Sequence, residues 1–135
     1  MPRAPMLYAQ VGSRLPLHAT GVGKVLLAYS PQDVVEHVMH HLAQFTSKTI
    51  VDAESLQREL ELIRQRGFAQ TREELHMGTA AIAVPIVDGE GSVESALGMV
   101  TSDVRKDLSK LLPALQVTAR GIARSLPPRH GTLAA

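Results

Sequence analysis

The 135-residue sequence has no cysteine and no tryptophan, and it has only two tyrosines and two phenylalanines. The absence of cysteine excludes disulfide bonds and thiolate metal sites, and it fits a reducing compartment, so we expect a cytoplasmic protein. The scarcity of aromatic residues excludes a stacking platform for single-stranded nucleic acid. It also leaves Leu, Val, Ile and Ala to fill the core of a single domain of modest size.

The sequence also lacks an excess of either charge and lacks long apolar runs. Fourteen basic and thirteen acidic residues give a formal net charge of +1. A DNA-binding module normally shows a basic face, so we expect no direct nucleic-acid binding by this chain. No apolar run approaches the ~20 residues of a membrane span, and residues 1–10 lack the apolar centre of a signal peptide. We therefore expect no membrane association.

The most informative segment that is present covers residues 15–28 and reads LPLHATGVGKVLLA. Thr20 is a good helix N-cap, and the amides of Gly21, Val22 and Gly23 follow it directly. The start of a helix leaves its first amides without partners and carries partial positive charge, so it can hold a carboxylate or another anion. The spacing of a Walker phosphate loop is absent. The residues alone leave two interpretations open: a plain helix cap, or a turn that contacts a ligand.

The pattern along the chain predicts an α+β fold with three strands in its second half. Asp52 and Gly67 are expected to be the N-cap and the left-handed C-cap of one helix, and residues 88–91 form a hairpin turn. Pro113 either kinks or divides the last helix. We predict helices over residues 20–29, 31–42 and 53–66 and from Ser102 or Asp103 to Leu126, and strands over residues 6–11, 68–74, 79–87 and 93–101.

Residues 15–28 resemble the opening of the second half of the effector-binding domain of IclR-type transcriptional regulators. Further segments follow in the order and at the spacing of that family: FTSKT (45–49), LQRELELIRQRG (56–67), FAQTREE (68–74), GTAAIAVPIVD (78–88) and the final helix (108–126). The resemblance covers residues 7 to 126. It implies a GAF-like fold, in which helices flank an antiparallel sheet. Residues 1–126 would form a domain that senses a small molecule, and residues 127–135 are expected to be a disordered tail.

The resemblance also implies that parts of the family's architecture are missing from this chain. A winged helix-turn-helix, through which such regulators bind DNA, and the first strands of the effector domain have no counterpart here. We therefore expect a C-terminal fragment, a truncated reading frame or a natural form without the DNA-binding part. The sheet is expected to be partly truncated at the N-terminus, with the strand over residues 6–11 as an unpaired edge.

The resemblance further implies association with copies of the same chain, as a homodimer or homotetramer. Apolar positions on the last helix point the same way, because they outnumber what one face of a small sheet covers. They are Leu108, Leu111, Leu112, Leu115, Ile122 and Leu126.

In proteins that this sequence resembles, the effector lies between the start of the helix and the central sheet. The matching positions here are Leu7, Leu15, Gly21, Val22, Thr71, Thr79, Ala81, Gly98 and Val100. Members that bind small oxo-acids tend to carry acidic, hydroxyl or thiol groups at the positions of Thr71, Ala81, Gly98 and Val100. Three of these four residues, all but Thr71, cannot form a hydrogen bond through a side chain. We therefore expect an effector with a carboxylate and a substantial apolar or aromatic body, for which small residues such as Ala81 and Gly98 make room. Composition alone favours the interpretation that all these positions are simply core residues.

No arrangement of catalytic groups is apparent, so we expect no enzyme activity and no cofactor. Glu73 and Glu74 are neighbours at the end of a strand and point to opposite faces, so they cannot both enter one pocket. Glu74 is expected to be structural and to tie the strand to a loop. A small enzyme that uses His18, Lys24 or Glu74 is one alternative, and a purely structural oligomerisation module is another.

A metal site is not expected either, although the chain has six histidines. His37 and His41 have the i, i+4 spacing that can chelate a transition metal, but no third ligand follows at a set spacing. We interpret them as surface residues of a helix. His18, which precedes the capped turn, is expected to orient that loop.

Overall fold

The computed structural model describes residues 11–127, which form helices on both faces of a small sheet. The predicted strand over residues 6–11, the candidate residue Leu7 and the predicted disordered tail fall outside, or almost wholly outside, this range. The elements are α1 (Gly21–Ala28), α2 (Gln32–Met39), α3 (Ala53–Arg66), β1 (Ala69–Arg72), β2 (Ala80–Val87), β3 (Val93–Thr101), the 3₁₀ helix η2 (Leu108–Leu111) and α4 (Leu112–Ser125).

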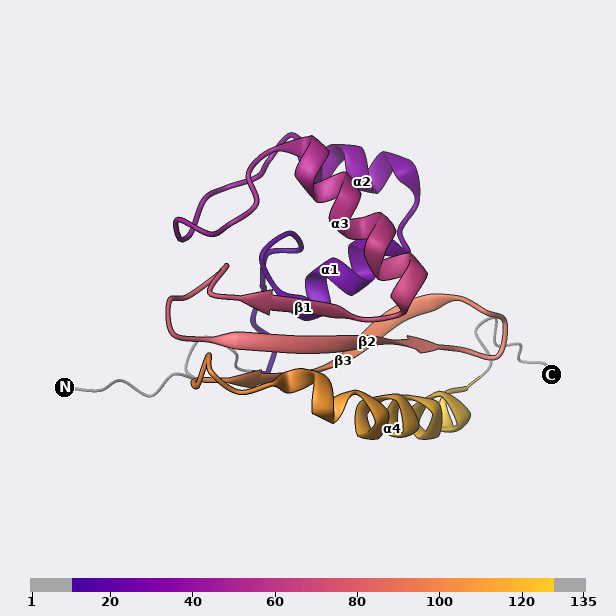
Figure 1. The fold of residues 1–135 in the computed structure, drawn as a ribbon. Coiled ribbons are helices and arrows are strands. Elements are labelled where there is room, and N and C mark those ends of the chain that lie inside the picture. The colour runs from indigo at the N-terminus through magenta and orange to yellow at the C-terminus, as the bar shows by residue number, and fades with distance from the viewer. Residues whose placement is uncertain (1–10, 128–135) are drawn as a thin grey trace.

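The three strands pair antiparallel in the order β1-β2-β3, which confirms the predicted α+β class. α1, α2 and α3 lie on one side of the sheet and α4 lies on the other (Figure 1). The register places Thr71, Ala81 and Val100 in one row across the three strands. Because alternate residues of a strand point to opposite faces, Ala81 and Ala83 face α1, whereas Ile82 and Val84 pack with α4.

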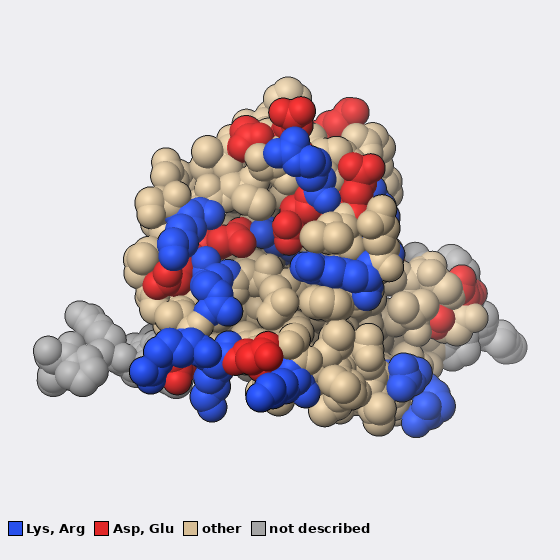
Figure 2. Space-filling model, viewed as in Figure 1, with Lys and Arg blue, Asp and Glu red and all other residues tan. Residues whose placement is uncertain are grey.

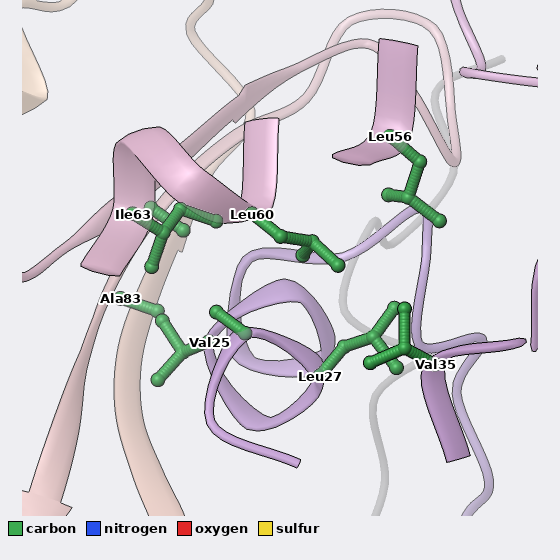
Figure 3. Close-up of a cluster of buried hydrophobic side chains, with 9 residues drawn as sticks. Val25, Leu27, Val35, Leu56, Leu60, Ile63 and Ala83 are labelled. Carbon is green, nitrogen blue, oxygen red and sulfur yellow. The ribbon is translucent and has the colours of Figure 1, made fainter. Parts of the chain in front are cut away.

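The main hydrophobic cluster joins α1 to α3. Val25 and Leu27 of α1 are fully buried, and they meet Leu56, Leu60 and Ile63, which lie on one face of α3 (Figure 3). Burying a side chain of this size stabilises a fold by about 1.5–3 kcal/mol. This cluster therefore fixes α1 against the sheet, and α1 in turn positions the site described below.

The predicted helix caps are confirmed. Thr20 accepts a hydrogen bond from the amide of Gly23 at 3.0 Å, and Asp52 accepts one from the amide of Ser55 at 2.8 Å. Gly67 ends α3 with a φ of 84°, a left-handed conformation that glycine adopts at little cost. The hairpin between β2 and β3 is also confirmed, with Asp88 accepting hydrogen bonds from the amides of Glu90 and Ser92.

The predicted start of the last helix is wrong. Residues 102–107 are not helical: Asp103 accepts a hydrogen bond from the amide of Arg105 in a local turn, and Asp107 accepts one from the amide of Ser109 as the N-cap of η2. α4 begins only at Leu112, after η2. Pro113 neither kinks nor divides the helix but lies in its first turn, where its missing N–H needs no partner. α2 is also shorter than predicted and ends at Met39.

Most of the apolar face of the last helix is covered within one chain, contrary to the sequence-based expectation. Leu108 and Leu115 are buried against Ile82 and Val84 of the sheet. The partly buried Leu111, Leu112 and Ile122 pack against the same cluster. Only Leu126 of the predicted set remains exposed, at 41%.

Charged side chains of both signs are interspersed on the face shown in Figure 2. This mixture agrees with the near balance of 14 basic and 13 acidic residues in the sequence. Within residues 11–127, no helix is both long enough and apolar enough to cross a membrane.

Candidate functional site

A cavity of about 210 Å³ lies between the start of α1 and the sheet. Of its lining residues, Thr71 on β1 is only 8% exposed, whereas Val100 on β3 is 55% exposed. The residues around it are mostly small or apolar: Leu15, Ala19, Thr20, Gly21, Val22, Thr71, Glu74, Leu75, Thr79, Ala80, Ala81, Ile82, Gly98, Met99 and Val100.

The start of α1 presents unpaired amides at this cavity. Thr20 binds the amide of Gly23 through its hydroxyl and the amide of Lys24 through its carbonyl oxygen. The amides of Gly21 and Val22 have no hydrogen-bond partner within the described range, and both residues line the cavity. A helix start with free amides carries partial positive charge, so this wall of the cavity suits an anionic group.

Small residues let α1 approach the sheet closely. A Cβ built on Gly21 would lie 3.4 Å from Cβ of Ala83 and 3.5 Å from Cβ of Ala81. A Cβ built on Gly98 would lie 2.9 Å from Cγ1 of Val22. The space left by the missing side chain of Gly98 is therefore occupied by Val22, and it does not enlarge the cavity as the sequence suggested.

The hydroxyls at the cavity differ in whether they are free to bind a ligand. Thr20 donates to the carbonyl oxygen of Pro16 at 2.8 Å, and Thr79 donates to that of His76, also at 2.8 Å. The hydroxyl of Thr71 makes no hydrogen bond to any other described residue, although Thr71 is only 8% exposed. Thr71 is thus a polar group of the cavity floor with bonding capacity to spare.

A buried ion pair forms part of the cavity wall. Lys24 of α1 is fully buried, and its Nζ lies 2.6 Å from Oε1 of Glu74, whose side chain is 13% exposed and lines the cavity. Neither of these two atoms has a further partner among residues 11–127. Burial raises the pKa of the Glu74 carboxyl, and the nearby charge of Lys24 offsets only part of that effect.

The side chain of Glu73 ties the end of β1 to the following loop. Glu73 has a φ of 60°, and its carboxylate accepts a hydrogen bond from the amide of Gly78 at 2.8 Å and one from Nζ of Lys48 at 2.7 Å. These bonds hold the pKa of Glu73 below its usual value. Glu74 also has structural contacts, because its carbonyl oxygen accepts a hydrogen bond from Oγ1 of Thr49 at 2.6 Å and its carboxylate pairs with Lys24. Of the two carboxylates only Glu74 lines the cavity, in agreement with the prediction that they cannot share a pocket.

His18 does orient the loop before α1, as predicted. It is 4% exposed, its Nε2 lies 2.8 Å from the carbonyl oxygen of Ala43, and its ring packs against Phe45. The rings of His37 and His41 lie 4.7 Å apart on α2. In the part of the chain that the structure describes, no group of three or more histidine or acidic side chains could hold a metal ion.

The structure brings together all the described residues that the sequence analysis named for the effector site. Leu15, Gly21, Val22, Thr71, Thr79, Ala81, Gly98 and Val100 all line the cavity. Glu74 also lines the cavity, although the sequence did not place it in the effector site. Its signal was present in the sequence, because a lysine amid the apolar residues of α1 is buried only when an acidic partner accompanies it.

The chain belongs to the family described as the C-terminal domain of the bacterial transcriptional regulator IclR, whose model matches residues 1–124. It is 32% identical over 128 residues to the HTH-type transcriptional regulator XynR of Escherichia coli, an alignment that covers 91% of this chain and 51% of that protein. More generally, the chain spans between one third and about one half of the length of such curated relatives.

Two similar solved structures contain aromatic acids. An IclR homologue from Microbacterium hydrocarbonoxydans, complexed with 4-hydroxybenzoate, has a TM-score of 0.81 and 31% identity, with 87% of this chain and 50% of that one covered. A double mutant of the PobR inducer-binding domain from Acinetobacter, complexed with 3-hydroxybenzoic acid, has a TM-score of 0.79 and 32% identity. That match covers 87% of this chain and 70% of the other.

Proposed function

We propose that this IclR-type effector-binding domain senses a carboxylic acid that has a substantial apolar or aromatic body. The acid group would accept hydrogen bonds from the amides of Gly21 and Val22, and the body would lie on the row formed by Thr71, Ala81 and Val100. The observation that carries the proposal is the juxtaposition of two unpartnered helix amides with a mostly apolar cavity.

The size and charge of the cavity support this class of ligand. A volume of about 210 Å³ is below the ~300–1,000 Å³ of pockets that hold drug-sized molecules, so it suits a single small ring. The charge of Glu74 is balanced by Lys24, so the walls do not carry a net negative charge that would repel an anion. The hydroxybenzoates in two similar structures belong to the same class.

We infer further that binding controls DNA recognition through a DNA-binding module outside this sequence, and that the domain works without catalysis, cofactor or metal. The proposal includes association of the domain with copies of itself. A purely structural oligomerisation module would have no use for unpartnered amides at a cavity, so ligand-induced stabilisation separates the two functions.

A thermal-shift and calorimetric titration tests the ligand class. We expect benzoate-sized acids to stabilise the protein, by about 2.7 kcal/mol at a concentration of 100 times the dissociation constant. Pyruvate serves as the control, because it has the carboxylate without the apolar body. Stronger stabilisation by pyruvate than by any aromatic acid would overturn the proposal.

A further inference from the structure

Glu74 is the only ionisable side chain among the described residues that line the cavity. It follows β1, whereas the unpartnered amides of Gly21 and Val22 begin α1, so the acceptor and the donors come from different elements. The mostly apolar cavity is therefore lined both by hydrogen-bond donors and by an acceptor.

The carboxylate of Glu74 has acceptor capacity left after it pairs with Lys24. Nζ of Lys24 contacts Oε1 at 2.6 Å, and no described residue donates to Oε2. A carboxylate has about four lone-pair sites. Because Lys24 is fully buried within α1, the ion pair also holds the carboxylate in a fixed place.

A ligand that fills this cavity displaces the water that would otherwise solvate Glu74. If the ligand places only apolar atoms there, a buried charged acceptor loses a hydrogen-bond partner, which is unfavourable. If the ligand places a hydroxyl there, the hydroxyl donates to the carboxylate in a charge-assisted hydrogen bond. A site of this kind discriminates strongly against an analogue that lacks the donor.

We propose that Glu74 is a specificity-determining residue that accepts a hydrogen bond from a hydroxyl on the ring of the effector. This inference rests on the proposed function, since it assumes that an aromatic carboxylate occupies the cavity. It narrows the ligand class to acids that carry a hydroxyl away from the carboxylate. A second carboxylate at that position would bring only acceptor atoms to Glu74, with no proton to donate, and is disfavoured.

The test compares ligands of the same shape. Dissociation constants are measured by calorimetry for 4-hydroxybenzoate against 4-methylbenzoate and for 3-hydroxybenzoate against 3-methylbenzoate, because each pair differs only by hydroxyl against methyl. We expect the unmodified protein to prefer the hydroxyl in at least one pair by roughly tenfold or more. Equal binding within both pairs would overturn this inference and leave the proposed function standing. Failure of all four acids to bind would overturn both.

Two variants at the ion pair assign the preference to Glu74. The double substitution Lys24→Met with Glu74→Leu removes both charges together, so that no unpaired charge is left in the core. It should reduce the preference to within about twofold of unity, because the acceptor is gone. Glu74→Gln keeps the size of the side chain and replaces a charged acceptor by a neutral one, so the preference should fall several-fold.

Two further variants complete the design. Glu73→Gln is the matched control, because the neighbouring carboxylate does not line the cavity, and the preference should persist. Thr71→Val removes a second polar group of the cavity, the hydroxyl of Thr71. A preference that survives in both Glu74 variants, or that disappears only with Thr71→Val, would overturn the assignment.

Discussion

Nζ of Lys24 lies 2.6 Å from Oε1 of Glu74, and this ion pair joins helix α1 to the segment that follows β1. The lysine is fully buried and the glutamate side chain is 13% exposed. A charge in such surroundings depends on its partner, because its removal from water is costly. The pair therefore has consequences for stability as well as for the cavity.

Glu74→Leu alone should destabilise the fold by about 3–5 kcal/mol, because it leaves the buried ammonium of Lys24 without a partner. Lys24→Met should cost less, because Glu74 reaches the cavity and can bind a proton. The free energy of unfolding of the double variant should be close to that of the unmodified protein, because replacement of a buried ion pair by apolar groups is often neutral. Urea unfolding measures all three free energies. Equal losses in the Glu74→Leu and double variants would contradict this account.

The raised pKa of Glu74 predicts a pH dependence of stability with a defined sign. Burial is the main cause, and it raises the folded-state pKa above the usual value of 4.5. Because the folded state binds this proton more tightly, the contribution to stability is present at low pH and is lost as the pH rises through the raised pKa. The free energy of unfolding should therefore fall with rising pH relative to that of the double variant, which lacks the group.

In the difference between the two proteins, the contributions of the other carboxyls with shifted pKa values cancel. Four other carboxyls among the described residues have lowered pKa values, so their contributions change in the opposite direction with pH, and both proteins share them: Asp52, Glu73, Asp103 and Asp107. A difference between the two proteins that grows in favour of the unmodified chain as the pH rises would contradict the assignment.

Gly23→Ala should destabilise the fold, because α1 has no room for a side chain at this position. A Cβ there would lie 2.5 Å from Oγ1 of Thr20 and 2.7 Å from Cα of Leu17. Overpacking of this kind costs about 1–3 kcal/mol, and loss of the Thr20 cap adds about 1 kcal/mol. Gly89→Ala is the control, since no atom lies within 4 Å of the new Cβ. A melting temperature unchanged in both variants would show that α1 does not need this close approach.

The domain is predicted to form a homodimer or homotetramer. In the part of the chain that the structure describes, β3 is an outer strand of the sheet, and Met99 and Val100 on it are 46% and 55% exposed. Val117 of α4 is exposed at 61%. Unpaired strand edges with apolar side chains favour association. Sedimentation at tens of micromolar should give a dimer or tetramer, and a well-behaved monomer would be evidence against it.

Local signals in the sequence predict the features of this fold that depend on a few neighbouring residues. The caps at Thr20, Asp52 and Gly67 follow from side-chain chemistry or from the freedom of glycine, and periodicity predicts the strands of the hairpin. The start of the last helix could not be predicted in this way, because the turn at Asp103 competes with helix formation and Asp107 caps a separate 3₁₀ helix after it.

The site shows the same division. The resemblance to a family named eight residues that line the cavity, but the pattern around Glu73 and Glu74 did not reveal which carboxylate turns toward it. That choice depends on the positive φ of Glu73 and on a lysine 50 residues away in the sequence, which are tertiary facts. The space at Gly98 was misjudged for the same reason, because Val22 of another element fills it.

The amides at the start of α1 are proposed to hold the carboxylate of the effector. Gly21→Pro removes one of these amides, and the position tolerates proline because the preceding residue, Thr20, has an extended backbone with ψ of 155°. Gly21→Ala is the matched control, since it keeps the amide and its Cβ makes only ordinary contacts of 3.4 Å or more.

The most direct measurement is therefore the affinity of these two variants for 4-hydroxybenzoate by calorimetry, with folding checked by thermal unfolding. Loss of a hydrogen bond to a charged group should weaken binding by roughly ten- to a hundredfold in Gly21→Pro, and Gly21→Ala should stay within a few-fold of the unmodified protein. Equal affinity in a folded Gly21→Pro variant and in Gly21→Ala would show that the carboxylate binds elsewhere.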